Sequence, residues 1–177
     1  MSGPGVVLSM GVGPVEAPAD REALRGLLVE FHEWMAEHAA RHAGVRYDVA
    51  GELAEDVGSI DRPANAAWLA RRDGAPGGCV LLLGGTAYLA EFARLWVTPA
   101  ARGIGLGREL VAAAVGTARE GGYATLGLST PPWATASHDL YESMGFVRTG
   151  PYPGTRLDEA HHDDAIFMRL DLTGQST

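Results

Sequence analysis

A glycine-rich hexapeptide, Arg102-Gly103-Ile104-Gly105-Leu106-Gly107, has the residue types and spacing that most clearly suggest chemistry in this sequence. It lies between a segment expected to form a strand and one expected to form a helix. Glycines at alternate positions let the backbone approach a ligand closely. The first N–H groups of the following helix have no partner within the helix and lie at the positive end of its dipole. The segment therefore predicts a site for a pyrophosphate group.

Two known phosphate-binding patterns fit this segment poorly. A nucleotide-binding P-loop ends in Gly-Lys-Ser/Thr because the lysine and the hydroxyl reach phosphates and magnesium, whereas Gly107 is followed by Arg108 and Glu109. A dinucleotide fingerprint needs a third glycine where Arg108 stands and an acidic residue after the next strand, where Thr130 stands. The pattern that remains is Arg/Gln-x-x-Gly-x-Gly/Ala, although a glycine-rich loop without a ligand would also fit the hexapeptide alone.

The segments on either side of the loop help to decide which kind of phosphate-bearing ligand it binds. Glu91 to Pro99 reads Glu-Phe-Ala-Arg-Leu-Trp-Val-Thr-Pro, and Leu140 to Phe146 reads Leu-Tyr-Glu-Ser-Met-Gly-Phe. With the loop between them, the sequence resembles the GCN5-related N-acetyltransferase (GNAT) family over residues 66–172, and more loosely over its first helices. The resemblance implies an α/β (α+β) fold of the acyl-CoA N-acyltransferase type. Its mixed, mostly antiparallel sheet of about six to seven strands parts in the middle and is flanked by about four helices.

The same resemblance implies acetyl-CoA as co-substrate, held in the opening between the two central strands. The strand residues Leu95, Trp96 and Val97 would contact its pantetheine arm, whose amides pair with the strand edge like an added strand. The amide of Leu95 would lie near the thioester oxygen, where a fixed donor stabilises an oxyanion. The other cofactor-binding residues that the resemblance implies are Arg102, Gly103, Ile104, Gly105, Leu106, Gly107 and Arg108 around the pyrophosphate, and Ser137 and Tyr141 near the thiol end.

Two residues are candidates for proton transfer. An ammonium has no lone pair and must lose a proton before it attacks, and some members of the family use a glutamate at the position of Glu91 as the base. If the strand is regular, alternation places Glu91, Leu95 and Val97 on one face, whereas a bulge would break this parity. Tyr141 occupies the family's tyrosine position and would protonate the departing thiolate. The alternatives are an exposed strand carboxylate for Glu91 and a packing role for Tyr141.

The elements that must position these residues are indicated by hydrophobic periodicity, caps and turn residues. Helices are expected from Asp20, as the cap, to Gly44, over Val49–Val57, from Leu106 to Gly121, and over about Thr135–Met144. Strands are expected at Val6–Ser9, Ala66–Arg71, Cys79–Leu83, Tyr88–Val97, Tyr123–Ser129, Phe146–Arg148 and Ala165–Leu172. Met1–Gly5 is expected to be a loose end, and residues 73–78 are expected to form turns.

Length and composition limit the class of protein. The 177 residues suit one domain over residues 1–177, and no apolar run approaches the roughly 20 residues of a membrane span. A net charge of −8 disfavours general nucleic-acid binding. The N-terminus lacks the basic region of a secretory signal, and the single Cys79 excludes an internal disulfide, so we expect a cytoplasmic location and a buried structural thiol. A metal site at His161-His162 is disfavoured, because adjacent residues of an extended chain point to opposite faces.

The sequence therefore predicts an enzyme that moves the acetyl group of acetyl-CoA to a primary amine by direct attack in a ternary complex. The acceptor is expected to be a small-molecule amine, a peptide N-terminus or a lysine, with no nucleic-acid or membrane partner. The identity of the acceptor and the oligomeric state, for which a homodimer stays open, do not follow from the sequence. Two other hypotheses remain: an inactive module that senses acyl-CoA, and transfer to a hydroxyl or of a longer acyl group. The presence of both Glu91 and Tyr141 favours the enzyme.

Overall fold

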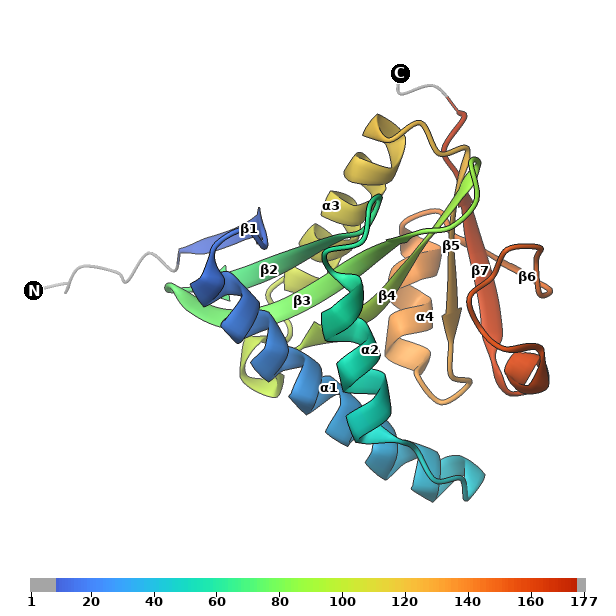
Figure 1. Ribbon diagram of the computed structural model, residues 1–177, viewed down its shortest axis with the longest axis horizontal. Helices are drawn as coiled ribbons and strands as arrows, with labels where there is room; N and C mark the ends of the chain where they lie inside the picture. The colour runs from blue at the N-terminus through green and yellow to red at the C-terminus, as the bar shows by residue number, and fades with distance from the viewer. Residues whose placement is uncertain (1–8, 175–177) are drawn as a thin grey trace, which may run out of the picture.

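The computed structural model describes residues 9–174, and within them helices cover both faces of a mixed sheet (Figure 1). The expected loose end Met1–Gly5 and most of the expected strand Val6–Ser9 lie outside the described residues. The helices are α1 (Pro18–Ala43), α2 (Val49–Ser59), α3 (Leu106–Glu120) and α4 (Thr135–Ser143), with short 3₁₀ helices η1 (Pro99–Ala101) and η2 (Glu159–Asp164). The strands are β1 (Met10–Pro14), β2 (Ala66–Arg72), β3 (Ala75–Gly84), β4 (Leu89–Val97), β5 (Thr125–Thr130), β6 (Val147–Thr149) and β7 (Ile166–Asp171).

The seven strands of the described residues are ordered β1-β2-β3-β4-β5-β7-β6. Every neighbouring pair is antiparallel except β4 and β5, which are parallel. A parallel pair needs a crossover connection, which α3 supplies between these two strands. The mixed, mostly antiparallel sheet that the sequence predicted is therefore confirmed.

The first helix starts earlier than the sequence indicated. Pro18 lies in its first turn, where the missing N–H of proline costs no hydrogen bond. Asp20 is not the cap, because its carboxylate accepts a hydrogen bond from the N–H of Ala17 at 3.1 Å from within the first turn. The helix ends as expected at Gly44, whose φ of 66° is the left-handed conformation that glycine adopts without strain.

The turn between β2 and β3 is shorter than expected. Asp73 and Gly74 form it, with φ of 51° and 81°, and β3 already begins at Ala75. The expectation that residues 73–78 form turns is therefore wrong beyond Gly74, because β3 continues to pair with β2 across a bulge. Within this strand a Cβ on Gly78 would lie 2.6 Å from the carbonyl oxygen of Trp96, so the close approach of β3 to the end of β4 depends on glycine.

The two faces of the sheet have separate cores (Figure 1). α3 and α4 cover one face, where the buried side chains include Leu110 and Tyr141. α1 and α2 cover the other, where Leu24 and Leu28 pack against strand residues that include Cys79. Cys79 is fully buried, as expected. None of the helices within residues 9–174 is long and apolar enough to cross a membrane.

The two central strands part in the middle of the sheet. β4 and β5 pair over three residues each, and the last pair joins Glu91 to Gly127. Beyond it, β4 continues its pairing with β3, and β5 continues its pairing with β7. The parting that the resemblance implied is therefore confirmed, and it begins at Glu91 and Gly127.

A bulge in β4 separates residues that a regular strand would place on one face. The register with β3 shifts within the strand, and Arg94 has a positive φ of 55°. Ala93 packs in the core under α1, whereas Leu95 and Val97 pack against the core under α3. Glu91 has the same parity as Ala93. Glu91 would share a face with Leu95 and Val97 only in a regular strand. The alternative considered from the sequence holds instead, because the extra residue at the bulge reverses the alternation.

Candidate active site

The glycine-rich loop has the geometry that the sequence predicted. Gly103 and Gly105 adopt left-handed φ of 78° and 92°. A Cβ on either glycine would meet no atom within 4 Å, so backbone conformation rather than packing requires glycine here. α3 begins at Leu106, with Gly105 as its N-cap. The first amides of α3, which have no partner within the helix, are therefore presented beside the loop.

Two arginines lie next to this helix start, with side chains at the surface. Arg102 donates from Nε to the carbonyl oxygen of Val97 at 3.0 Å, and its guanidinium lies 5.1 Å from the centre of the Trp96 ring. Arg108 donates from Nη2 to Ser143 Oγ at 2.7 Å. An arginine carries five N–H donors, so each side chain has further donors for an anion. Their positive charge adds to that of the helix dipole.

The opening between β4 and β5 adjoins the loop. Gly107 links the two, since a Cβ there would lie 3.4 Å from a methyl of Leu140 on α4 and 3.7 Å from a methyl of Val97. Beyond Glu91, β4 presents main-chain groups to the opening, and such groups need partners when water is excluded. An extended ligand with amide groups could pair with this edge while its phosphates reach the start of α3.

Tyr141 of α4 lies in the core on the same face as Leu95. It is 5% exposed, and its ring meets that of Phe92 edge-on with the centres 5.2 Å apart. Burial raises the pKa of the Tyr141 phenol, and a hydrogen bond with Ser137 opposes this effect. The phenol therefore remains protonated at neutral pH, as a proton donor to a thiolate must be.

Trp96 directs its side chain to the opposite face. The ring is buried under α1, and Nε1 donates to Glu30 Oε2 at 3.3 Å. Its ring centre lies 6.3 Å from that of Phe31 and 5.7 Å from that of Trp34. A contact between Trp96 and a ligand on the Leu95 side of the opening would therefore come from the main chain of Trp96.

Glu91 stands where β4 and β5 part, and it is buried rather than exposed, at 5% exposure. Its Oε1 accepts a hydrogen bond from the hydroxyl of Tyr152 at 2.6 Å, and its Oε2 accepts one from the N–H of Arg156 at 2.8 Å. Both donors belong to the segment between β6 and β7. Sequence reasoning missed them, and the signal that could have found them is a tyrosine set between Gly150-Pro151 and Pro153-Gly154.

A partly buried network of charged and polar side chains, with His32 and Asp56 at its buried centre, joins α1 and α2 to the bulge of β4. His32 is fully buried, with Tyr47 Oη 2.7 Å from its Nδ1 and Asp56 Oδ2 2.8 Å from its Nε2. The same Asp56 oxygen accepts a hydrogen bond from Arg94 Nε at 2.7 Å. Arg94 also donates from Nη2 to Glu52 Oε2 at 2.8 Å. No sequence pattern indicated this network, because its members come from separate elements: α1, the connection that follows it, α2 and β4.

Asp56 and Arg94 both stay charged in this network, although burial opposes their ionisation. Burial raises the pKa of Asp56, but the hydrogen bonds and charges of His32 and Arg94 outweigh it and keep that pKa below its usual value. Burial lowers the pKa of Arg94, and the neighbouring Asp56 carboxylate outweighs this, so the guanidinium stays charged. Arg94 is also the β4 residue with positive φ. The bulge is therefore fixed by an ion pair between β4 and α2.

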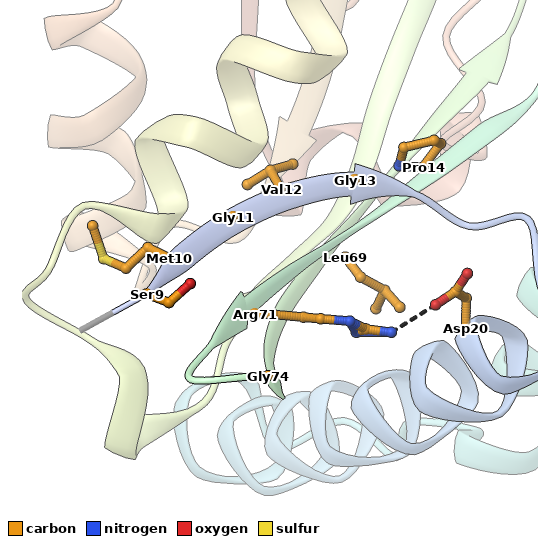
Figure 2. A pocket seen from close by; sticks show the side chains of 10 residues that line it. All are labelled: Ser9, Met10, Gly11, Val12, Gly13, Pro14, Asp20, Leu69, Arg71 and Gly74. Carbon is orange, nitrogen blue, oxygen red and sulfur yellow. Dashed lines mark hydrogen bonds and ion pairs between the residues drawn. The ribbon is translucent and has the colours of Figure 1, made fainter. Parts of the chain in front are cut away.

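Two hollows lie near β1. One, of about 350 Å³, is formed by β1, β2 and the start of α1, and Arg71 and Asp20 form an ion pair there at 2.6 Å (Figure 2). It lies at the edge of the sheet, away from the central strands. The other, of about 160 Å³, lies between β1 and the glycine-rich loop and is lined in part by Ile104 and Gly105. Of the two, the smaller one adjoins the candidate site.

The adjacent histidines His161 and His162 belong to η2. His162 Nε2 lies 3.0 Å from the carbonyl oxygen of Leu157, while His161 is exposed. Within residues 9–174 no group of three or more His, Cys, Asp and Glu side chains could hold a metal ion.

Comparison with known proteins gives matches to acetyltransferases in both sequence and structure. The model of the Acetyltransferase (GNAT) family matches residues 23–146. An uncharacterized N-acetyltransferase of Schizosaccharomyces pombe is 26% identical over 168 residues, which cover 93% of this chain and 96% of that protein. The structure of yncA from Salmonella typhimurium with its cofactor acetyl-CoA has a TM-score of 0.62 at 22% identity, covering 95% and 96% of the two chains. The structure of the PaiA N-acetyltransferase from Thermoplasma acidophilum in complex with coenzyme A has a TM-score of 0.68 at 16% identity, covering 92% and 99%.

Proposed function

The chain belongs to the acetyltransferase (GNAT) family, and from this premise we propose that it transfers the acetyl group of acetyl-CoA to a primary amine. One observation carries the proposal: two central strands part beside a glycine-rich loop that opens a helix. The parted strands suit the amide-bearing arm of the cofactor, and the helix start suits its pyrophosphate. The acetyl-CoA and coenzyme A in the similar Salmonella and Thermoplasma structures support this assignment.

Binding of the cofactor is divided between main chain and side chains. The main chain of Leu95, Trp96 and Val97 pairs with the pantetheine arm. This pairing is favoured because these residues lie on the part of β4 that has separated from β5. The amides of residues 103–108 bind the pyrophosphate, and Arg102 and Arg108 add charge. Ser137 and Tyr141 meet the thiol end of the cofactor from α4.

The reaction proceeds by direct attack in a ternary complex. Glu91 serves as the base for the ammonium, and the neutral nitrogen then attacks the carbonyl carbon of the thioester. The amide of Leu95 stabilises the oxyanion, the C–S bond breaks, and Tyr141 protonates the thiolate. The bulge at Arg94 supports separate places for the base and the acid, because it leaves Glu91 on the face of β4 opposite to Leu95 and Tyr141. The amine approaches from the α1 side, and the thiol leaves on the α3 side.

A route through an acetylated cysteine is disfavoured by the state of the only cysteine of the chain, Cys79. It is fully buried in the core under α1, and burial raises the pKa of its thiol. A protein nucleophile must be activated and accessible to accept an acyl group. Direct attack by the amine needs no such residue.

The acceptor is a small-molecule amine, a peptide N-terminus or a lysine side chain. A net charge of −8 favours a cationic acceptor through long-range attraction. The cytoplasm is the proposed location of the reaction. The identity of the acceptor is a matter for a direct screen.

The screen uses acetyl-CoA with spermidine, kanamycin, free amino acids and short peptides, and follows release of free thiol. Transfer to at least one amine is expected, together with acetyl-CoA binding measured by calorimetry. Arg102→Ala with Arg108→Ala is expected to weaken that binding, whereas Arg119→Ala, an exposed arginine at the other end of α3, serves as the control. Acetyl-CoA binding without turnover of any of these compounds would favour a sensing module instead, and a product that carries the acetyl group as an ester rather than an amide would favour an O-acyltransferase.

A further inference from the structure

Tyr152, which the sequence did not single out, lies at the point where the central strands part. The residue is 6% exposed, and its hydroxyl is 2.6 Å from Glu91 Oε1. The ring is held by an edge-on contact with Phe167, with centres 5.7 Å apart, and by the guanidinium of Arg169 at 5.8 Å. The phenol is therefore fixed in one orientation, aimed at the carboxylate.

The strand opposite Glu91 leaves room for this hydroxyl. Gly127 is the β5 partner of Glu91 in the last pair before the strands separate. A Cβ on Gly127 would overlap the Tyr152 hydroxyl and would lie 2.6 Å from Cζ of the ring. The absence of a side chain at Gly127 thus allows the phenol to lie against β5 at the apex of the opening.

Both oxygens of the Glu91 carboxylate already have protein donors. Tyr152 donates to Oε1, and the main-chain N–H of Arg156 donates to Oε2 at 2.8 Å. The N–H of Arg156 cannot pass on a proton, but the hydroxyl of Tyr152 can both accept and donate one. We infer that Tyr152 is a further catalytic residue, through which the proton of the acceptor ammonium reaches Glu91. This inference rests on the proposed amine acetylation.

The proton transfer balances in one concerted step. An N–H bond of the ammonium breaks as its proton binds Tyr152 Oη. The original O–H bond of Tyr152 breaks as that proton binds Glu91 Oε1. The products are a neutral amine, an unchanged phenol and a neutral carboxylic acid, so the positive and negative charges cancel. The amine now has the lone pair with which it attacks the thioester.

The electrostatics of Tyr152 agree with a relay rather than with an independent base. Burial and the charge of Glu91 raise the pKa of the phenol. A phenolate therefore does not form at neutral pH, and the hydroxyl keeps a proton that it can give only as it receives another. The carboxylate remains the final proton acceptor.

The inference is tested with the amine that wild-type enzyme acetylates best in the screen described above. Tyr152→Phe keeps the ring and removes the hydroxyl. Its kcat at pH 7 is expected to fall by about 10²- to 10⁴-fold, the usual contribution of a positioned acid–base group. Its kcat is expected to recover as pH rises toward the pKa of the ammonium, because free amine then needs no relay. The dissociation constant of acetyl-CoA should be unchanged.

The shape of the pH profile separates catalysis from structure. A role limited to packing would lower kcat by the same factor at every pH, and this result, or an unchanged kcat at pH 7, would overturn the inference. Tyr88→Phe, which alters a tyrosine that is 74% exposed, is the matched control. A wild type that binds acetyl-CoA but acetylates no amine would contradict the proposed function itself, and the relay with it.

A second variant guards against misfolding of Tyr152→Phe. Gly127→Ala retains both Tyr152 and Glu91 but places a methyl group where the hydroxyl lies. It should reproduce the loss of kcat at pH 7 and the recovery at high pH. Glu91→Gln combined with Tyr152→Phe should be no worse than Glu91→Gln alone, because both residues act on one proton. Additive losses would contradict a shared pathway.

Discussion

Replacement of Asp56 by Asn tests whether the network at the bulge of β4 stabilises the protein. The change keeps the volume of the side chain and removes its charge. Asp56 is 4% exposed, and its Oδ2 lies 2.8 Å from His32 Nε2 and 2.7 Å from Arg94 Nε. Removing one partner of a buried ion pair costs about 3–5 kcal/mol. Arg94 keeps its ion pair with Glu52 at 2.8 Å, so we expect the lower end of that range, about 3 kcal/mol.

Equilibrium unfolding in urea measures this cost. With a slope of about 2 kcal/mol per molar urea, a loss of about 3 kcal/mol moves the midpoint down by about 1.5 M. Asp61→Asn is the control, because Asp61 pairs with Arg21 at 2.8 Å with its side chain 74% exposed. Such a surface pair contributes about 0–1 kcal/mol. Equal midpoints for Asp56→Asn and Asp61→Asn would refute the reasoning from burial.

The same variant makes a prediction about pH. The folded protein lowers the pKa of Asp56 below its ordinary value of 3.8. A carboxylate with a lowered pKa stabilises the fold above its unfolded pKa, and this contribution disappears as pH falls through the folded pKa. The difference in unfolding free energy between wild type and Asp56→Asn should therefore be full near pH 6 and shrink below about pH 4. A difference that persists undiminished in acid would show that charge is not its cause.

Three further predictions concern the cofactor site and the buried thiol. Gly105→Ala forces a side chain into a φ of 92°, which costs about 1–2 kcal/mol in the left-handed region, and should weaken acetyl-CoA binding about tenfold in calorimetry. Gly116→Ala, within α3 and with open space around it, should bind normally, and equal affinities of the two variants would contradict a role for the loop. Tyr141→Phe should lower kcat about 100-fold with an unchanged acetyl-CoA dissociation constant. Because burial raises the pKa of Tyr141, wild-type kcat should not fall with a midpoint near 10, and such a fall would argue against this acid. Cys79 should resist iodoacetamide in the native protein and react in urea, as followed by mass spectrometry, and fast native alkylation would contradict its burial.

The helices and the glycine-rich loop could be predicted because their causes are local. Gly103 and Gly105 are required by their own φ angles, and Gly44 ends α1 for the same reason. α1 starts before Asp20, the cap expected from the sequence, because Asp20 acts from within the first turn, on the N–H of Ala17. This error is small, since a carboxylate near a helix start is favourable at more than one position.

The faces of β4 could not be predicted in the same way. Alternation is a local rule, but the bulge that reverses it depends on Arg94, whose side chain is held by Asp56 from α2. These two residues are 38 positions apart in the chain. The partners of Glu91 are more distant still, since Tyr152 is 61 positions away and Arg156 is 65. Contacts of this kind arise when the sheet and its helices assemble.

The sequence by itself determined where a pyrophosphate could bind, because alternate glycines and a helix start form that site within one short segment. Tertiary structure alone decided which face of the central strand carries Glu91, and that this carboxylate is buried between a phenol and a backbone amide. The physical reason is that an anion site at a helix end uses the main chain of neighbouring residues. The environment of a carboxylate is set instead by side chains that folding brings together from separate elements.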